Sequence, residues 1–403
     1  MTEGEIHVSG DVISYVGPTP DVPIAFDREL DCGGNLLLPA FKNAHTHSAM
    51  TFLRSFADDL PLQTWLTEKV FPFEAQLTPE DVNVLSRLAI LEYLSSGMST
   101  NFDMYYYRDA IADASISLGF RTVLMGAAND FGGTAAEMER EYKKFNVLHP
   151  RISYRMGFHA EYTTSLPLMQ DIAAMTQQYK EPMFAHIAET KAEVEGCVSR
   201  YGMRPFALLD SLGMFEYGGG GFHCVHVSEQ EMEIMQQRGL YAVTCPGSNT
   251  KLASGIAPIT AYLARGIPVA IGTDGPASNN CLDMFREMFL VTGLQKLLHG
   301  ADAVDAVDVL SMACCNGARC LGLSDCDSLA PGKQADIVMI DLDRPNMQPI
   351  NDVLKNVVYS GSKENVKMTM VAGRILYENG TFFVNDDPER IYRAANAVIN
   401  RMR

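Results

Sequence analysis

Positive charge is scarce in this chain of 403 residues. Lysine and arginine number 32 against 49 aspartates and glutamates, which gives a formal net charge of −17 at pH 7. Such a chain repels phosphate backbones, so we expect no binding to nucleic acid. Apolar runs are also short, and none approaches the ~18 residues that a membrane-spanning helix needs. We therefore expect no membrane partner.

Cysteine pairs suited to disulfide or redox chemistry are missing as well. The nine cysteines form no Cys-x-x-Cys pair, and Cys314 and Cys315 are adjacent, an awkward geometry for a bridge. The first residues lack the basic and then apolar segments of a secretion signal. These absences favour a soluble cytoplasmic protein with reduced thiols.

No Gly-x-Gly-x-x-Gly motif follows any strand-like run, which removes the main support for an open dinucleotide-binding sheet. From about residue 35 to residue 320, short apolar runs alternate instead with longer helix-like segments. The runs lie at 36–45, 98–104, 120–127, 152–159, 182–187, 221–227, 240–245 and 268–273. Thr78 and Ser228, each followed by acidic residues, are typical helix starts. Eight such units predict an α/β fold, a (β/α)₈ TIM-like barrel.

Both ends of the chain differ from this pattern. Short alternating strands with turn residues between them occupy 6–34 and about 325–385. We expect them to pair into one small β-sandwich, a composite β-domain of residues 1–34 and 325–403. The catalytic barrel, residues 35–324, is then an insertion between the two halves of that domain.

Polar side chains gather where the predicted strands end. They are His45 and His47 at the first run, His159 at the fourth, His186 at the fifth, His223 in the sixth and Asp274 at the eighth. Taken singly, each has an ordinary interpretation, such as a core histidine or a helix cap. Together they coincide with the C-terminal strand ends, where barrel enzymes carry their catalytic groups. The pattern therefore predicts a site.

The residue types in this group match a metal site. A catalytic divalent metal needs three or four protein ligands and one position for a water, whose pKa it lowers. Three histidines and one carboxylate supply such a set: His45, His47, His186 and Asp274. Glu189 is placed to act as a general acid, and His223 to orient hydroxide or to stabilise developing charge. We expect one divalent ion per chain, with zinc favoured and iron or manganese as alternatives.

Longer motifs around these residues carry a family resemblance. The most specific are residues 38–47, 64–66, 186–190, 223–226, 271–280 and 331–338. With them the chain resembles the amidohydrolase superfamily. Within it, the chain is similar to the branch of aromatic deaminases and chlorohydrolases related to S-adenosylhomocysteine/5′-methylthioadenosine deaminases. The resemblance covers nearly the whole chain.

The resemblance implies roles for particular residues. It implies the same four metal ligands, with Glu189, His223 and Asp274 as the catalytic groups. It also implies that Trp65, Glu74 and His159 contact the adenosine part of a nucleoside. The fourth strand ends without a lysine that could be carbamylated, which argues against a binuclear site. Hydrophobic packing for Trp65 and a solvated loop for Glu74 remain the ordinary alternatives.

Two segments depart from the family pattern. Members that accept S-adenosylhomocysteine have arginines in and after the third strand, whereas residues 123–134 contain none here. An arginine fork is hard to replace in carboxylate recognition, so a substrate with an anionic tail is disfavoured. After the seventh strand, residues 244–249 read Thr-Cys-Pro-Gly-Ser-Asn where relatives usually have Asn-Pro-Ala-Ser-Asn. We expect Cys245 to alter the pocket wall.

The implied activity is hydrolytic deamination of an aminated purine, such as 5′-methylthioadenosine, 5′-deoxyadenosine, adenosine or S-adenosylhomocysteine. Guanine or pterin deamination and triazine chlorohydrolysis use the same metal core and stay open. A cyclic amide hydrolase usually has a binuclear carbamylated-lysine site, and a non-catalytic binding protein is expected to have lost a ligand. A cytidine-type zinc deaminase needs a Pro-Cys-x-x-Cys motif, which is absent. We expect a small-molecule substrate and a homo-oligomer.

Overall fold

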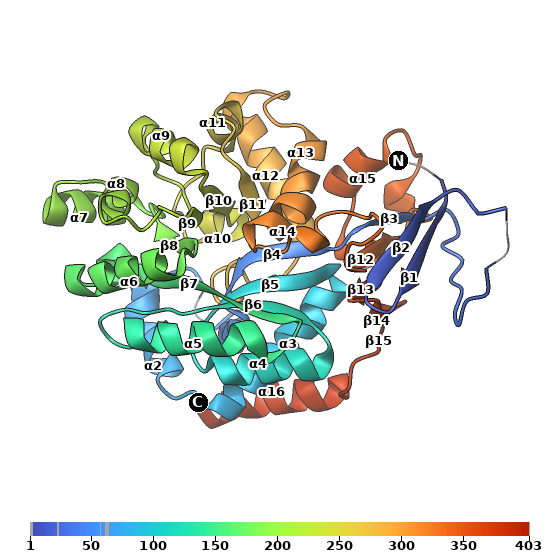
Figure 1. Ribbon diagram of the computed structural model, residues 1–403, viewed down its shortest axis with the longest axis horizontal. Helices are drawn as coiled ribbons and strands as arrows, with labels where there is room; N and C mark the ends of the chain where they lie inside the picture. The colour runs from blue at the N-terminus through green and yellow to red at the C-terminus, as the bar shows by residue number, and fades with distance from the viewer. Residues whose placement is uncertain (1–2, 22–23, 57, 61–63, 403) are drawn as a thin grey trace.

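A nearly closed barrel of eight parallel strands forms the centre of the molecule (Figure 1). The computed structural model describes residues 3–21, 24–56, 58–60 and 64–402. The barrel strands are β4 (Phe41–Thr46), β5 (Met98–Met104), β6 (Arg121–Met125), β7 (Ile152–Ala160), β8 (Met183–Ile187), β9 (Gly219–His223), β10 (Tyr241–Thr244) and β11 (Val269–Ile271). Each strand pairs in parallel with the next one along the chain.

The first and last strands meet at the site end of the barrel. The backbone N–H of Asp274, just after β11, donates to the carbonyl oxygen of His45 in β4 at 3.0 Å. The Asn43 side chain reinforces this junction, since its Nδ2 donates to Thr273 Oγ1 at 2.7 Å and its Oδ1 accepts from the Thr273 N–H at 2.9 Å. The predicted (β/α)₈ barrel is confirmed.

Helices surround the strands in Figure 1. They are α2 (Phe71–Glu74), α3 (Pro79–Ser95), α4 (Arg108–Leu118), α5 (Ala135–Leu148), α6 (Leu166–Tyr179), α7 (Lys191–Tyr201), α8 (Pro205–Ser211), α9 (Glu229–Arg238), α10 (Pro246–Lys251), α11 (Ile259–Ala264), α12 (Met284–His299), α13 (Ala306–Ser311), α14 (Gly317–Cys320), α15 (Val353–Tyr359) and α16 (Pro388–Met402). Thr78 and Ser228 form capping boxes with the third residues of α3 and α9, which confirms both predicted helix starts. Among the helices of the described ranges, none is both long and apolar enough to cross a membrane.

The barrel interior is packed, so it offers no passage through the molecule. Side chains from seven of the strands form one buried apolar cluster, together with residues of the chain at and after α14: Ala44, Phe102, Met104, Val123, Met125, Phe184, Phe222, Val243, Ala270, Cys320 and Leu321. Asn316 Nδ2 donates to the carbonyl of Val269, the first residue of β11, at 3.1 Å. The segment around α14 thus covers the N-terminal end of the barrel, which leaves the opposite end for chemistry.

Two antiparallel sheets form the small β-structure beside the barrel. One contains β1 (Glu5–Ser9) and β2 (Val12–Gly17), and the other has the order β15 (Thr381–Phe382), β14 (Arg374–Glu378), β13 (Val366–Val371), β12 (Ile337–Ile340) and β3 (Leu36–Pro39). Ile13 of the first sheet shares a buried cluster with Ile337, Met339 and Met368 of the second. This confirms a small two-layered β-structure formed from both ends of the chain.

One predicted strand was wrong in its extent. Residues 36–45 form two strands: β3 pairs with β12 of the small sheet, whereas β4 belongs to the barrel. Ala40 alone separates the two strands, and all six residues of β4 are buried although most of them are polar, so the pattern shows no loop between the strands. The division into domains at 34/35 and 324/325 stays a prediction.

After the last strand, α16 packs along α3 of the barrel, where Arg401 pairs with Asp81.

A buried ion pair joins the barrel to the small sheet. Arg121 begins β6, and its Nε and Nη2 each lie 3.2 Å from a carboxylate oxygen of Asp336, directly before β12. Asp336 also accepts the backbone N–H of Ala372 at 2.8 Å. Burial would raise the pKa of Asp336, but Arg121 holds it below its usual range. Without Asp336, Arg121 would keep hydrogen bonds to Gln334 and Pro150 but would lose its carboxylate partner.

We predict that Asp336→Ala lowers the free energy of unfolding by about 3–5 kcal/mol, because it leaves the Arg121 guanidinium buried and unpaired. Urea unfolding followed by circular dichroism measures the change. The control is Arg28→Ala, which breaks the Arg28–Glu378 pair at a side chain that is 58% exposed, with an expected cost under about 1 kcal/mol. Equal losses for the two variants would contradict the role given to the buried pair.

Candidate metal centre and active site

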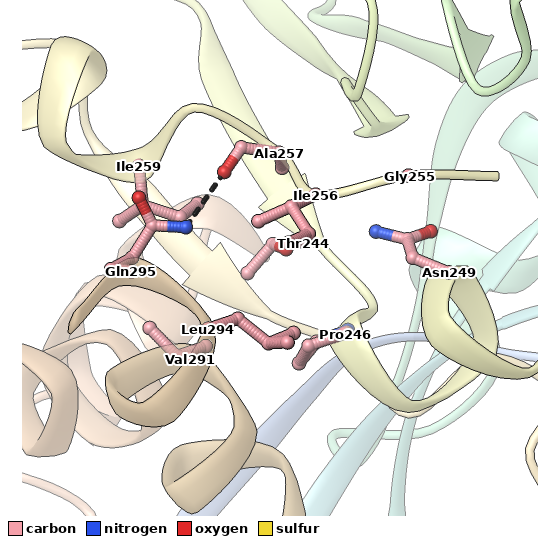
Figure 2. Close-up of a pocket in the computed structure, with 10 residues that line it drawn as sticks. All are labelled: Thr244, Pro246, Asn249, Gly255, Ile256, Ala257, Ile259, Val291, Leu294 and Gln295. Carbon is pink, nitrogen blue, oxygen red and sulfur yellow. Dashed lines mark hydrogen bonds between the residues drawn. The ribbon is translucent and has the colours of Figure 1, made fainter. Parts of the chain in front are cut away.

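Two cavities lie near the C-terminal ends of the strands, and they differ in chemistry. The smaller, of about 220 Å³, lies between β10 and α12, and its described lining contains no acidic, basic, histidine or cysteine side chain (Figure 2). The larger encloses about 730 Å³, including space open to solvent, and contains most of the predicted site residues. The larger cavity is therefore the candidate site.

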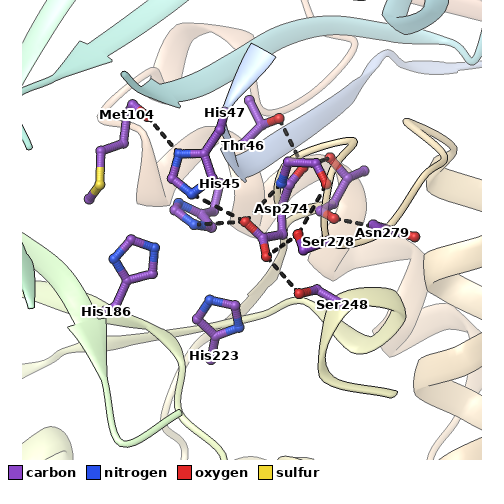
Figure 3. A network of polar contacts seen from close by, with 12 residues as sticks. His45, Thr46, His47, Met104, His186, His223, Ser248, Asp274, Ser278 and Asn279 are labelled. Atoms are coloured by element: carbon purple, nitrogen blue, oxygen red, sulfur yellow. Dashed lines mark hydrogen bonds and ion pairs between the residues drawn. The ribbon is translucent and has the colours of Figure 1, made fainter. Parts of the chain in front are cut away.

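Four of the predicted residues converge at the base of the larger cavity. His45 lies near the end of β4 and His47 directly follows it, so the i, i+2 spacing places both imidazoles on one side of the chain. Asp274 Oδ1 lies 3.6 Å from His45 Nε2 and 3.2 Å from His47 Nε2. His186, in β8, points into the same space, as Figure 3 shows.

The possible ligand atoms form two overlapping sets of three, each close enough to share one ion, and the four predicted ligands are divided between these sets. His45, His47 and Asp274 offer three atoms within 4.8 Å of one another, and His45, His186 and His223 offer a second such set. His45 belongs to both groups and is fully buried, yet neither of its ring nitrogens has a hydrogen-bond partner among the described residues. An orphaned buried imidazole of this kind fits a missing cation.

The outer nitrogens of two imidazoles are already used. His47 Nδ1 donates to the carbonyl oxygen of Met104 at 2.6 Å, and His186 Nδ1 donates to that of His159 at 2.7 Å. In His186 this leaves Nε2 as the free acceptor that metal-binding histidines usually have, and in His47 it leaves Nε2 facing Asp274 Oδ1 at 3.2 Å, where a metal ion would take the place of the Nε2 proton. Burial also lowers the pKa of His45 to about 3 and that of His186 well below its ordinary value, so both rings stay neutral as ligands must.

Asp274 is held as a carboxylate by a dense set of donors. Ser248 Oγ and Ser278 Oγ both donate to its Oδ2 at 2.6 Å, and the Gly275 N–H donates to Oδ1 at 2.8 Å (Figure 3). Burial would raise the pKa of Asp274, but His45 and His47 bring it well below the ordinary value. Burial likewise lowers the pKa of His47, yet the contact with Asp274 raises it to about 9. Asp274 and the protonated His47 ring thus carry opposite charges, and a bound metal ion would take the place of the proton on His47.

Glu189 and His223 form the second part of the centre. Glu189 follows β8 and its Oε2 lies 3.8 Å from His223 Nε2, while Ser254 Oγ donates to its Oε1 at 3.1 Å. His223 ends β9, and its Nδ1 donates to Asn249 Oδ1 at 2.8 Å. Burial lowers the pKa of His223, but Glu189 and Asp274 more than reverse that effect. A carboxyl group and an imidazole are thus available beside the candidate ligands.

The predicted substrate contacts line the same cavity. Trp65 comes from the π-helix η2 (Trp65–Val70), Glu74 ends α2, and His159 lies in β7. Tyr105 OH donates to Glu74 Oε1 at 2.6 Å, and burial raises the pKa of Glu74 to about 7. Every predicted site residue except His45 lines the cavity, and His45 lies behind the wall.

The sequence did not single out several residues of this centre. Ser248, Asn249 and Ser278 hold Asp274 and His223, and Tyr105 holds Glu74. The first three lie inside the motif segments 244–249 and 271–280, which was the available signal. The expected effect of Cys245 on the pocket wall is not direct, because Cys245 is fully buried and is absent from the described lining.

Comparison with known proteins agrees with this geometry. The amidohydrolase family matches residues 36–376. A 5-methylthioadenosine/S-adenosylhomocysteine deaminase of Moorella thermoacetica is 39% identical over 399 residues, which cover 97% of this chain and 93% of that protein. A crystal structure of an adenosine deaminase from Xanthomonas campestris with bound zinc has 34% identity and a TM-score of 0.94, covering 98% of this chain and 93% of that one.

A more distant structure shows the same fold. An atrazine chlorohydrolase from Arthrobacter aurescens, complexed with zinc, has a TM-score of 0.88 and 23% identity over 98% of this chain and 94% of its own. At that identity the likeness concerns the fold alone. The family match and the closely similar relatives confirm the resemblance read from the motifs: the chain belongs to the amidohydrolase family.

Proposed function

We propose that this protein is a metal-dependent hydrolytic deaminase that releases ammonia from an aminated purine. The preferred substrates are adenosine analogues such as 5′-methylthioadenosine, 5′-deoxyadenosine, adenosine or S-adenosylhomocysteine. The observation that carries the proposal is the convergence of three imidazoles and one carboxylate on a cavity that also contains Glu189 and His223. The names of the relatives from Moorella and Xanthomonas support the same reaction.

One divalent ion per chain, preferably zinc, would be held by His45, His47, His186 and Asp274. The donor set of three nitrogens and one oxygen suits zinc, although iron and manganese accept the same ligands. When bound, the ion supplies a nucleophile near neutral pH by lowering the pKa of a water. The orphaned nitrogens of His45, the free Nε2 of His186 and the Nε2 of His47 that faces Asp274 support this assignment.

The side chains around the ion would divide the proton transfers. Asp274 would accept one proton from the attacking water and pass it to the leaving amino group, which departs as ammonia, while the second water proton restores Glu189 as the carbon–oxygen double bond forms. Glu189 donates a proton to the ring nitrogen next to the reacting carbon, which lets that carbon accept electrons. His223 Nε2 has no hydrogen-bond partner within the described part of the chain, so it is free to stabilise the charge that develops on the oxygen.

The cavity wall supports a purine nucleoside with a neutral tail. Trp65, Glu74 and His159 would contact the adenosine part, as the family resemblance implies. The rest of the described lining is largely apolar or aromatic, and it contains no lysine or arginine. An anionic carboxylate would therefore lose its hydration without gaining a charged partner. A homo-oligomeric state and a cytoplasmic location remain predictions.

The alternative reactions would require different side chains in the cavity wall, but the same metal ligands. Guanine or pterin deamination and triazine chlorohydrolysis would use the same ligands. A cyclic amide hydrolase would be expected to show a second metal site, and the described residues near the cavity offer no lysine for it. A non-catalytic binding protein would have no need for Glu189 and His223 beside the ligands.

A screen for ammonia release tests the proposal. The panel contains adenosine, 5′-methylthioadenosine, 5′-deoxyadenosine, S-adenosylhomocysteine, guanine and pterins. We expect kcat/KM for the neutral adenosine analogues to exceed that for S-adenosylhomocysteine by roughly 10–100-fold, because the carboxylate lacks a charge-assisted partner. Faster turnover of guanine or a pterin would favour the alternative, and no release from any compound would refute the deaminase assignment.

We predict that Asp274→Asn lowers kcat by roughly 10²–10⁴-fold on the best substrate, since the amide cannot accept and return a proton. The variant should also retain less zinc, as measured by elemental analysis, while circular dichroism shows a folded barrel. Asp302→Asn, at an exposed position after α12, serves as the matched control. Turnover of Asp274→Asn close to that of the control would refute the assignment of Asp274.

The buried Glu74 should make stability depend on pH. Its pKa rises to about 7 in the folded protein from an ordinary value of 4.5, so the folded state binds more protons between these values. The contribution is therefore lost as pH rises, and Glu74→Gln should gain up to roughly 3 kcal/mol relative to wild type between pH 4.5 and 8.

Urea unfolding of metal-free protein at both pH values measures the effect, because a bound cation would lower the pKa of Glu74. Glu233→Gln, at an exposed position on α9, is the control and should show no such change. A stability difference between Glu74→Gln and wild type that is constant over this range would show that Glu74 ionises normally.

A further inference from the structure

A buried carboxylate behind the site has no part in the proposed chemistry. Glu287 lies on α12, and its side chain is fully buried. Its Oε2 accepts the backbone N–H of Gly247 at 2.8 Å, and its Oε1 accepts Asn279 Nδ2 at 2.8 Å. Burial raises the pKa of Glu287 to about 7, against the effect of these two hydrogen bonds. Burying a carboxylate is costly, so its position calls for a physical reason.

The two donors belong to two segments that hold site residues, namely α10, directly after β10, and the loop after β11. Gly247 precedes Ser248, and Asn279 follows Ser278. The hydroxyls of both serines donate to the same oxygen of Asp274, each at 2.6 Å. Glu287 thus joins α10 to the loop after β11 directly behind Asp274, whose contacts with both serines appear in Figure 3.

The segment that contains Gly247, α10, also contacts His223. Asn249, two residues after Gly247, accepts the hydrogen bond of His223 Nδ1 at 2.8 Å. Asn279 is fixed from a second side, because its Nδ2 also donates to the Thr273 carbonyl, next to Asp274, at 2.7 Å. Displacement of α10 would therefore disturb Asp274 and His223 together.

The space for this contact depends on a glycine. A Cβ at Gly247 would lie 2.5 Å from Glu287 Oε1 and 2.6 Å from Asn279 Oδ1. Both distances are far inside van der Waals contact, so a side chain at 247 would push the carboxylate away. The close approach of backbone to carboxylate requires the residue without a side chain.

We propose that Glu287 is a positioning residue that clamps α10 to the loop after β11 and so fixes the orientation of Asp274 and His223. The inference rests on the proposed metal site and deepens it. Glu287 acts through Gly247 and Asn279, and through them on the serine hydroxyls. Loss of the clamp should weaken metal binding and slow the chemical step, whereas the substrate-contacting wall formed by residues 65–74 is untouched.

The same helix offers a matched control. Gln295 lies about two turns further along α12 and is also buried. Its Nε2 donates to the Ala257 carbonyl at 2.9 Å, the contact drawn in Figure 2, and its Oε1 accepts the Thr260 N–H at 3.3 Å. None of these groups contacts Asp274 or His223. Gln295→Ala therefore reports the general cost of losing a buried polar side chain on α12.

The test measures zinc affinity by competition with a chromophoric chelator, and kcat and KM on the best substrate, using the full-length protein. We expect Glu287→Ala to raise the zinc dissociation constant and to lower kcat by about 10–100-fold each, with KM changed by less than about two-fold. Glu287→Gln keeps one accepting oxygen and should lie between this variant and wild type. Gln295→Ala should leave zinc affinity and kcat within about two-fold.

A mutant cycle separates positioning from a general structural role. If Glu287 acts through the serines, Glu287→Ala should cost little more zinc affinity in a Ser248→Ala/Ser278→Ala background. Additive losses, an equal loss in Gln295→Ala, or zinc affinity of Glu287→Ala close to that of wild type would each overturn the proposal.

Two provisions keep the test decisive. If Glu287→Ala does not fold, Glu287→Gln and Gly247→Ala carry the same comparison, because each breaks one side of the clamp. Zinc affinity is measured without any substrate. A wild-type protein that binds zinc as expected but releases no ammonia would refute the deaminase assignment, while the zinc data alone would still decide the role of Glu287.

Discussion

The centre depends on one buried carboxylate. Asp274 is only 5% exposed, and an ionised carboxylate in such a place must be compensated by donors or by positive charge. Serine hydroxyls and a backbone N–H satisfy the side of the carboxylate that faces the loops, and imidazoles stand on the side that faces the cavity. A cation between the carboxylate and those imidazoles completes the compensation, which is why a metal fits where a proton alone leaves His45 without a partner.

The backbone at the ends of the strands is strained to deliver these side chains. Ala188, His223, Cys224 and Asp274 all have positive φ angles, between 50° and 69°. Non-glycine residues rarely take this left-handed conformation, which costs roughly 1–2 kcal/mol each. All four positions lie within or next to the candidate site, at the ends of three different barrel strands. The packed interior and the loop contacts stabilise conformations that the isolated segments would avoid.

Local signals were sufficient to predict the barrel and most of its centre. The alternation of apolar runs with helix starts such as Thr78 gave the architecture, and the histidines at strand ends gave the site. The spacing within one strand was enough for His45 and His47. Convergence of His186, His223 and Asp274 followed from the topology, because parallel strands of a barrel end on the same side.

What the sequence did not show depends on contacts between distant segments. The break at Ala40 was missed because a single residue separates β3 from β4, and only their pairing shows that they belong to different sheets. Nothing in the sequence distinguishes Ser248, Ser278 and Glu287 from other polar residues, and only the folded structure shows that they converge behind Asp274. The packing of α16 on α3 could not be predicted either, since an amphipathic sequence indicates that a helix has a buried face but not which element covers that face.

The polar groups and much of the apolar wall of the cavity come from different segments, which explains how one fold can serve different reactions. The strand ends supply the polar groups that would activate water and move protons. One segment before α3, residues 65–74, supplies five of the cavity-lining residues: Trp65, Leu66, Val70, Phe71 and Glu74. This segment is separate from the barrel strands, so it can change without disturbing the candidate ligands. A distant structure that shares the fold at 23% identity thus gives no information about the substrate here, and in the proposed function the wall formed by this segment would select the substrate.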